Sequence, residues 1–495
     1  GGGGGGGGEA PSPAAPWSLE LDWGPLVSSM ADADGNERVR AAGPFWETAE
    51  GPDGMRLRAV PRPLYTRAAD PSTKRASWDS LWPLASGRTF GPERSWRVGT
   101  AYFQDSDRTD PASAYRFWLL PVWFHGRDRD QTKYAALFPV GGEIRNILFK
   151  DSIRFALWPL WVNSRVNDVR TTDVLFPVFS RTTTPDGRID KVRVFPLYSR
   201  SKKEGQFEKT SLFWPVWTHA RYLHPKAKGT AWVLFPVCGR VNLNSQKGWM
   251  FLPPFFQHVR GEGVTRTFFP WPFFQRETGE RSKLSVWPLF GYRVDGPLRR
   301  SYWLWPIVNR ERNEWGRRAM VRWSVVPFYT HATYSSAWLP SERRAAEASG
   351  EALPEPEVTG KRTKLWPLVS RQYDREAGAY RLRLLDLWPG SRPPPVERNW
   401  APIWTLLDYR ARGASSDLEV LWGLYRATRR EEGARTFSLF PLWRHERTGG
   451  DGARRWSVLK GLMAYDRTAT NRHMRFLWLG RIRLATPEAT EPDPS

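Results

Sequence analysis

One short motif recurs along almost the whole 495-residue chain, about once every nineteen residues. It consists of an aliphatic and an aromatic residue, a proline, an aliphatic residue and usually another aromatic residue. Copies include ALWPLW around Pro159, VLFPVF around Pro177 and SLFPLW around Pro441, and two late copies have Gly423 and Gly461 in place of the proline. Internal repetition at one period predicts a repeat architecture before any other feature is considered.

Glycines in turn contexts lie about halfway between the prolines. Gly187 stands in PDGR and Gly205 in KEGQ, and both contexts are typical of β-hairpin turns. The residues between the turns are rich in Val, Thr, Trp, Phe and Tyr, which suit a pleated sheet. No segment has the periodicity of a long helix. The sequence therefore predicts an all-β fold, a large antiparallel up-and-down meander with its turns at the glycines.

Two positions for the proline remain open. The apolar run continues straight through the proline, which favours about two dozen continuous strands of roughly 12–15 residues with proline at mid-strand. Proline lacks the N–H that a central strand needs, which favours a hairpin unit with a corner at each proline. We favour the continuous strands. We expect the meander to close as a barrel, and an open hairpin-repeat sheet or a solenoid is the alternative.

Basic residues follow the motif at a constant offset. The position four residues after the proline is Arg or His in most repeats, and the position two after it is usually aromatic. Because alternate residues of a strand share a face, we expect two rows of basic residues, one on each side of an apolar belt. We predict that these rows bind anions through the residues Arg67, Arg181, Arg200, Arg240, Arg276, Arg310 and Arg371. The alternative is a solvated margin in which each cation contacts a neighbouring aromatic ring.

The ends of the chain differ in composition from the repeats. Residues 1–16 are rich in glycine and proline and predict a flexible tether, and residues 485–495 predict a disordered acidic tail. We expect a single β-repeat domain over residues 17–484. Within it, the Ala/Glu/Pro-rich segment 341–362 predicts a mobile inserted loop.

The composition and the motifs limit the function. The chain carries 74 Lys and Arg and a formal net charge of +23, so we expect a polyanionic partner. No catalytic motif, metal-binding spacing or cofactor-binding motif is present, so we expect no enzyme activity, no catalytic residue, no metal and no cofactor. The single cysteine, Cys238, excludes a disulfide within one chain.

Three functions agree with this pattern. We favour an outer-membrane β-barrel of a bacterial cell envelope, with a pore, transport or structural role, whose basic rows contact anionic lipid or lipopolysaccharide headgroups. The second is a soluble or tethered periplasmic or extracellular β-repeat protein that binds an acidic polymer or a lipid. The third, a platform for single-stranded nucleic acid, has the least support, because the regular spacing of the aromatic residues is explained by the belt. The ligand, the closure of the sheet and the oligomeric state stay open.

Overall fold

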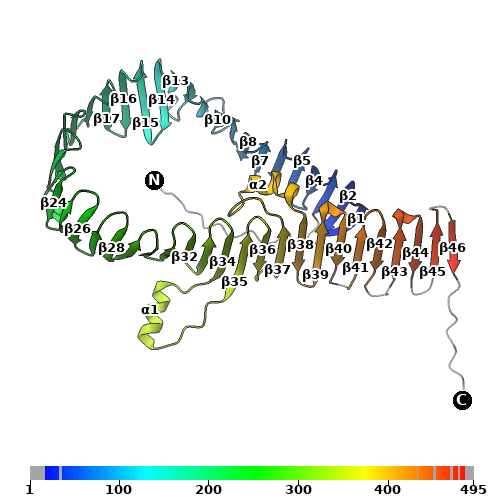
Figure 1. Ribbon diagram of the computed structural model, residues 1–495. Helices are drawn as coiled ribbons and strands as arrows, with labels where there is room; N and C mark the ends of the chain where they lie inside the picture. Colours follow the sequence, from blue (N-terminus) through cyan, green and yellow to red (C-terminus); the bar gives the residue numbers. More distant parts are fainter. Residues whose placement is uncertain are drawn as a thin grey trace. The chain divides into compact units, whose positions relative to one another are not determined.

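The computed structural model describes residues 17–32, 36–431, 433–449, 453–468, 472–477 and 480–484. Strands make up 58% of the chain and helices 6%, and the strands form one long antiparallel up-and-down meander that is not closed (Figure 1). The predicted all-β meander is therefore confirmed, and its open sheet agrees with the alternative rather than with a closed barrel. The predicted tether 1–16 and acidic tail 485–495 lie outside the described residues.

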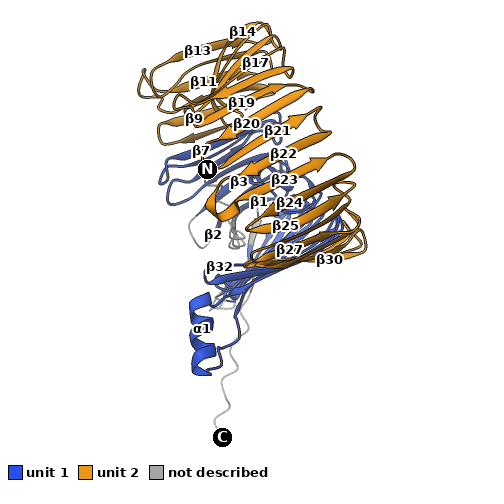
Figure 2. Ribbon diagram, turned by 90° about the vertical axis from the view of Figure 1, so that its left-hand side faces the viewer, with its two compact units in different colours: residues 1–86, 314–495 blue, residues 87–313 orange. Residues whose placement is uncertain are grey.

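The chain divides into two compact units where the sequence predicts one repeat domain (Figure 2). The first unit comprises residues 1–86 and 314–495, and the second comprises residues 87–313. We describe each unit by itself.

The first unit begins with a run of seven strands, each paired antiparallel with the next. They are β1 (Trp17–Trp23), β2 (Val27–Asp32), β3 (Glu37–Ala41), β4 (Trp46–Glu50), β5 (Arg56–Ala59), β6 (Thr66–Asp70) and β7 (Arg75–Ser80). Strand β8 (Ala85–Phe90) follows at the boundary between the units.

The second unit holds the next run of paired strands, which ends with β32 at the second boundary. Its first half is β9 (Glu93–Val98), β10 (Ala101–Asp105), β11 (Tyr115–Leu119), β12 (Trp123–Arg127), β13 (Lys133–Leu137), β14 (Gly141–Ile147), β15 (Lys150–Ala156), β16 (Trp161–Val166), β17 (Val169–Val174), β18 (Phe179–Thr183), β19 (Ile189–Val194) and β20 (Tyr198–Lys203). Its second half is β21 (Phe207–Leu212), β22 (Trp217–Tyr222), the 3-10 turn η1 (Pro225–Ala227), β23 (Gly229–Leu234), β24 (Cys238–Leu243), β25 (Gln246–Phe251), β26 (Phe256–Gly261), β27 (Val264–Phe268), β28 (Phe274–Gly279), β29 (Arg281–Val286), β30 (Phe290–Asp295), β31 (Leu298–Trp303) and β32 (Val308–Trp315).

The first unit ends with a third run of paired strands, into which three short helices are inserted. The elements are β33 (Arg318–Val325), β34 (Tyr329–Ser336), α1 (Pro340–Ser349), β35 (Val358–Leu365), β36 (Val369–Asp374), β37 (Ala379–Leu384), α2 (Pro394–Asn399), α3 (Ala401–Trp404), β38 (Leu407–Arg412), β39 (Ser415–Val420), η2 (Leu421–Gly423), β40 (Tyr425–Arg429), β41 (Arg435–Leu439), β42 (Trp443–Arg447), β43 (Arg454–Val458), η3 (Leu459–Gly461), β44 (Met463–Arg467), β45 (Arg472–Phe476) and β46 (Gly480–Leu484).

The prolines of the repeat lie in tight turns, not at mid-strand. The strands are four to eight residues long, so the prediction of about two dozen strands of 12–15 residues is wrong. At Pro177 the N–H of Val178 donates to the carbonyl of Leu175 at 2.7 Å, and the chain reverses between β17 and β18. Because proline cannot donate to a ladder, the turn accommodates it without loss of a hydrogen bond. This is the hairpin-corner alternative.

The glycine turns lie where the sequence places them. Gly187 has φ of 70° and Gly205 has φ of 66°, in the left-handed region that side chains disfavour. No neighbouring atom would touch a Cβ at either position, so the backbone conformation alone selects glycine there. Most repeat strands therefore connect a proline turn at one end with a turn that lacks the proline motif, often a glycine turn, at the other.

Segment 341–362 is not one unstructured loop. It contains most of α1 and the first residues of β35. The run SERRAAEAS is composed largely of strong helix formers, and Pro340 occupies the first turn, where proline is tolerated. Glu342 accepts a hydrogen bond from the N–H of Leu339 at 2.9 Å, and Gly350 ends the helix with φ of 70°. In the described part of the chain, no helix is long and apolar enough to cross a membrane.

The two units differ in what they bury. In the second unit a small apolar core forms around Phe124, Ala136, Ile144 and Phe155. In the first unit, residues near the N-terminus contact residues 416 and 379 positions later: Ser438 donates to Asp22 at 2.7 Å and Arg40 to Glu419 at 2.6 Å. Strands β1–β7 therefore form one layer against strands of the third run, and many of the side chains buried in this unit are polar or charged.

Candidate functional site

The two kinds of turn give the sheet two different edges. Neighbouring strands run in opposite directions, so alternate turns lie at the same edge, with the prolines of the repeat motif at one edge and turns such as those at Gly187 and Gly205 at the other. We call the proline turns the proline edge. In the second unit it carries exposed large apolar side chains at each turn, among them Leu157, Trp158, Leu160, Leu175, Phe176, Val178, Phe213, Trp214, Val216, Leu304, Trp305 and Ile307.

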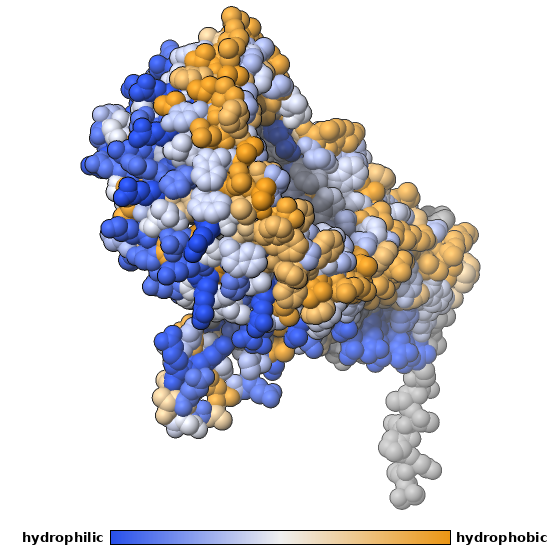
Figure 3. All heavy atoms as spheres, turned by 60° about the vertical axis from the view of Figure 1, so that its left-hand side comes forward, coloured by the Kyte–Doolittle hydropathy of each residue, from blue (hydrophilic) through white to orange (hydrophobic). Residues whose placement is uncertain are grey.

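This apolar edge is exposed to solvent. Phe213 is 63% exposed and Trp214 is 56% exposed, although both are large apolar side chains. Figure 3 shows hydrophobic side chains gathered in bands and hydrophilic side chains gathered away from them. A contiguous exposed apolar surface of this kind is typical of a membrane or partner contact.

Register places the residues next to the proline edge in rows. One face of the sheet, here the aromatic face, carries the residue two positions after each proline. Its first row is apolar, and each residue in it lies opposite the next. In β16–β23 this row is Trp161, Val174, Phe179, Val194, Tyr198, Leu212, Trp217 and Leu234.

The second row of the aromatic face contains most of the predicted site. From β16 to β32 it reads Asn163, Thr172, Arg181, Val192, Arg200, Thr210, His219, Trp232, Arg240, Trp249, His258, Thr267, Arg276, Leu284, Tyr292, Ser301 and Arg310. Five of the seven predicted arginines thus share one row. The expectation of two rows around a belt is wrong, because the chain reverses at each proline and returns both halves of the belt to the same side.

The predicted arginines are exposed. Arg181, Arg200, Arg240 and Arg276 have no carboxylate partner among the described residues, and Arg310 is also exposed. Arg181 and Arg200 lie two strands apart, at about 10 Å, and Arg200, Arg240, Arg276 and Arg310 follow one another at every fourth strand, about 19 Å apart. Their anion binding stays a prediction.

The two remaining predicted arginines lie outside this row. Arg67 is exposed between Arg58 and Trp78 in the first unit. The guanidinium of Arg371 lies 5.2 Å from the ring centre of Tyr380, which is the cation–ring contact of the structural alternative.

The densest cationic feature was not predicted. On the aromatic face of β40–β45, one row farther from the proline edge, six consecutive strands each contribute an arginine directly opposite the next. We call this row the arginine ladder: Arg429, Arg435, Arg447, Arg454, Arg467 and Arg472. Like charges directly opposite one another destabilise a sheet. None of the six has a carboxylate partner within the residues that the structure describes.

The sequence does contain a weak signal for the ladder. Arg429, Arg447 and Arg467 each stand six residues after Gly423, Pro441 and Gly461. The other three arginines precede the motif at an offset that is not constant. Only the strand register shows that both sets lie in one row.

An apolar surface lies between the ladder and the proline edge. The indole rings of Trp443 and Trp456 stack at 5.5 Å with an angle of 8°, and Trp456 stacks on Tyr465 at 5.9 Å. The faces of the Trp456 ring are therefore occupied by its neighbours. A hollow of about 510 Å³ opens here, with Leu418, Ala427, Phe437 and His445 beside Arg429, Arg435 and Arg447 in its lining.

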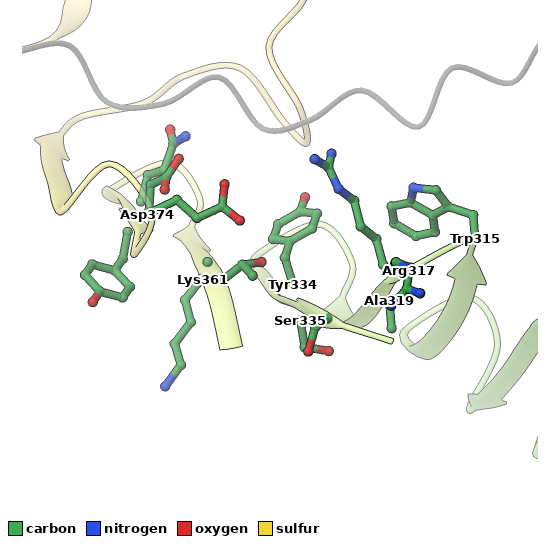
Figure 4. A pocket seen from close by; sticks show the side chains of 14 residues that line it. Trp315, Arg317, Ala319, Tyr334, Ser335, Lys361 and Asp374 are labelled. Carbon is green, nitrogen blue, oxygen red and sulfur yellow. The ribbon is translucent and has the colours of Figure 1, made fainter. Parts of the chain in front are cut away.

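A second hollow in the first unit has a different character. It measures about 200 Å³ and is lined by Trp315, Arg317, Tyr334 and Lys361 among others. In Figure 4 the side chain of Lys361 points away from those of Arg317 and Tyr334. Arg317 is also paired with Glu342 of α1 at 2.5 Å. No set of converging free charges forms here, so we place the candidate site on the aromatic face.

Neither a scan against protein-family models nor a search of curated proteins gave a match to this chain. In the described residues there is also no group of three or more His, Cys, Asp or Glu side chains that could hold a metal ion.

Proposed function

We propose that this protein is a non-enzymatic protein that binds the surface of an anionic lipid layer. The proline edge enters the apolar part of the layer, and the cationic rows of the aromatic face contact the phosphate groups. The observation that carries the proposal is the order of the rows: exposed apolar turns, then an apolar row, then arginines without carboxylate partners.

The dimensions suit binding at an interface. The second row lies four residues after the proline, about 13 Å from the turn along the strand and less in depth when the strand is tilted. Interfacial elements typically bury their apolar side about 5–10 Å into the boundary between headgroups and acyl chains. Guanidinium groups at that level would meet lipid phosphates, with which arginine forms paired hydrogen bonds.

Crossing a membrane has weaker support than binding to its surface. The strands have at most eight residues, and a membrane-crossing strand needs about 9–11. The sheet is also open. We therefore prefer a surface contact to the outer-membrane barrel expected from the sequence. A bacterial-envelope membrane with phospholipid or lipopolysaccharide headgroups remains the location that we propose.

Two other polyanions fit less well. An acidic polymer would use the arginines but would leave the proline edge exposed to water. Single-stranded nucleic acid would need free aromatic faces for stacking, whereas the rings of Trp456 and its neighbours stack on one another.

Vesicle co-sedimentation tests the proposal. Vesicles of phosphatidylcholine with phosphatidylglycerol should bind the protein more tightly than phosphatidylcholine alone, and salt should weaken the difference. The triple variant Arg435→Gln, Arg447→Gln, Arg454→Gln should bind about a hundredfold more weakly, since each arginine near an anionic surface contributes about 1 kcal/mol.

A matched control removes the same charge from the opposite face of the same part of the sheet. The triple variant Arg444→Gln, Arg455→Gln, Arg475→Gln should keep most of the binding, because these arginines pair with Glu446 and Asp466. Equal losses of vesicle binding in the two triple variants would show that binding depends on net charge alone. That outcome would contradict a specific binding surface on the aromatic face.

A further inference from the structure

A second cationic site lies inside the first unit, between its two layers. A cavity of about 240 Å³ is bounded by the first run, the third run and the helices α2 and α3. Seven arginines line it. The first run contributes Arg38, Arg40 and Arg62, and the third run and α2 contribute Arg381, Arg383, Arg398 and Arg410.

The carboxylates of this cavity do not balance the arginines. The lining carboxylates are Glu47, Glu397, Asp408 and Glu419, and the buried Asp79 outside the lining pairs with Arg398 at 2.5 Å, which leaves an excess of two positive charges. Burial would raise the pKa of these acids, but the arginines lower the pKa of Glu397 and of Glu419 to about 2, so both are ionised at neutral pH. Each carboxylate is already engaged by at least one arginine.

The pairing of these groups is incomplete. Arg40 bonds Glu419 at 2.6 Å through Nη1, yet its Nε has no hydrogen-bond acceptor among the described residues. The Nε of Arg398 is also buried without a hydrogen-bond acceptor among the described residues. A buried donor without an acceptor, and more so an unbalanced buried charge, is costly in a folded protein.

The arginines also repel one another. Burial lowers the pKa of Arg381 to about 9, and the nearby Arg383 and Arg410 contribute in the same direction. An added anion would reverse this effect by supplying the missing negative charge.

We propose that this cavity binds a phosphate group, either as free inorganic phosphate or in a small phosphate ester. Its volume equals that of about eight liquid water molecules, which is smaller than a typical site for a drug-sized ligand. Guanidinium groups bind phosphate oxygens in pairs, and the surplus charge and the unpaired donors match such an anion. The site is separate from the aromatic face and does not depend on the lipid-binding proposal.

Isothermal titration calorimetry with inorganic phosphate, at constant ionic strength set with chloride, tests this site. We expect saturable binding of one phosphate per chain and a rise of the unfolding temperature that saturates with it. Absence of saturable binding to the wild-type protein would overturn the proposal.

Leu57 lines the same cavity and allows a decisive substitution. Leu57→Glu supplies a carboxylate in place of the ligand, so phosphate affinity should fall at least about tenfold and the unfolding temperature without phosphate should rise. Leu57→Gln is the uncharged control and should retain binding. Equal phosphate affinity of the two variants would contradict the site.

Arg40→Gln offers an independent check if Leu57→Glu does not fold. It removes a lining donor and should also weaken phosphate binding about tenfold. The ladder variant Arg435→Gln, Arg447→Gln, Arg454→Gln should bind inorganic phosphate as the wild-type protein does. Loss of phosphate binding in that variant would show that phosphate binds at the ladder and would overturn the cavity site. If the ladder variant loses vesicle binding and keeps phosphate binding, both proposals are supported.

Discussion

Arg435 of β41 lies directly opposite Arg447 of β42, and each has another arginine as its second cross-strand neighbour. Cross-strand partners are about 5 Å apart between their Cβ atoms, so the row concentrates positive charge along six strands. A fold selected only for stability would place a carboxylate or a neutral residue at alternate positions. This row of like charges is the reason that we propose an anionic partner from outside the chain.

Removing one cation from the middle of the ladder should stabilise this part of the sheet. Arg447→Thr eliminates two like-charge pairs, and we expect a gain of about 0.5–2 kcal/mol at low salt that shrinks as salt is added. Hydrogen exchange of the β41–β43 amides measures the local stability. Arg455→Thr is the control, because Arg455 pairs with Asp466 at 2.6 Å and its loss should not stabilise. No gain for Arg447→Thr would mean that the repulsion is already screened.

The proline edge should contribute to lipid binding and little to folding. Phe213→Ser with Trp214→Ser removes two exposed apolar side chains, so the free energy of unfolding should change by less than about 1 kcal/mol. Binding to anionic vesicles should fall by about two to four orders of magnitude, since each side chain buried in lipid contributes roughly 1.5–3 kcal/mol.

Fluorescence quenching by lipid-borne probes follows Trp214 directly. Quenching in the wild-type protein is expected only when vesicles are bound. The control for the proline-edge variant is Phe207→Ser, which removes an aromatic side chain at the glycine-turn end of β21. This variant should leave vesicle binding unchanged. If Trp214 stayed unquenched in vesicle-bound protein, the proline edge would not be the part that enters the lipid.

The buried ion pairs should hold the two layers of the first unit together. Arg426 is 2% exposed and bonds Glu419 at 2.9 Å and Ser28 at 3.1 Å. Arg426→Met leaves Glu419 and Asp22 short of a buried cation, and we expect a loss of about 3–5 kcal/mol. Urea unfolding measures it. The exposed Arg429, three residues away, is the control, and Arg429→Met should change the free energy of unfolding by less than about 1 kcal/mol, with a small gain if its repulsion with Arg435 is relieved.

The pH dependence of stability should contain a contribution from Asp417. Burial, with a smaller effect of Glu419, raises its pKa from 3.8 to about 6. Between these values the folded state holds the proton more tightly than the unfolded state, so this contribution falls as pH rises from about 4 to 6, by on the order of 3 kcal/mol.

Asp417→Asn isolates that contribution. The variant should be more stable than the wild-type protein at pH 7, and the difference should vanish below about pH 4, where Asp417 is protonated in both states. Unfolding curves over this pH range give the comparison. A difference that does not change with pH would show that Asp417 is not the titrating group.

The sequence alone determined the repeat, the all-β antiparallel class and half of the turns, because each depends on local chemistry. Gly187 and Gly205 mark turns by the backbone conformation that only glycine adopts easily. The shared face of Arg181 and Arg200 follows from the alternation of side chains along strands. These properties are set within one hairpin and are visible in one repeat.

The tertiary structure decided the place of the prolines, the arginine ladder and the contacts between distant segments. Each of these depends on which residues a side chain faces after folding. The apolar run at Pro177 is the same for a buried mid-strand and for an exposed turn, and only the surroundings distinguish them. The ladder needs the register of six strands, since Arg435 stands six residues before Pro441 whereas Arg454 stands seven residues before Gly461. The contact of Asp22 with Ser438 joins residues 416 positions apart, and no local pattern specifies such a pairing. Local preferences select strands and turns, whereas burial and charge balance between distant segments exist only once the chain has folded.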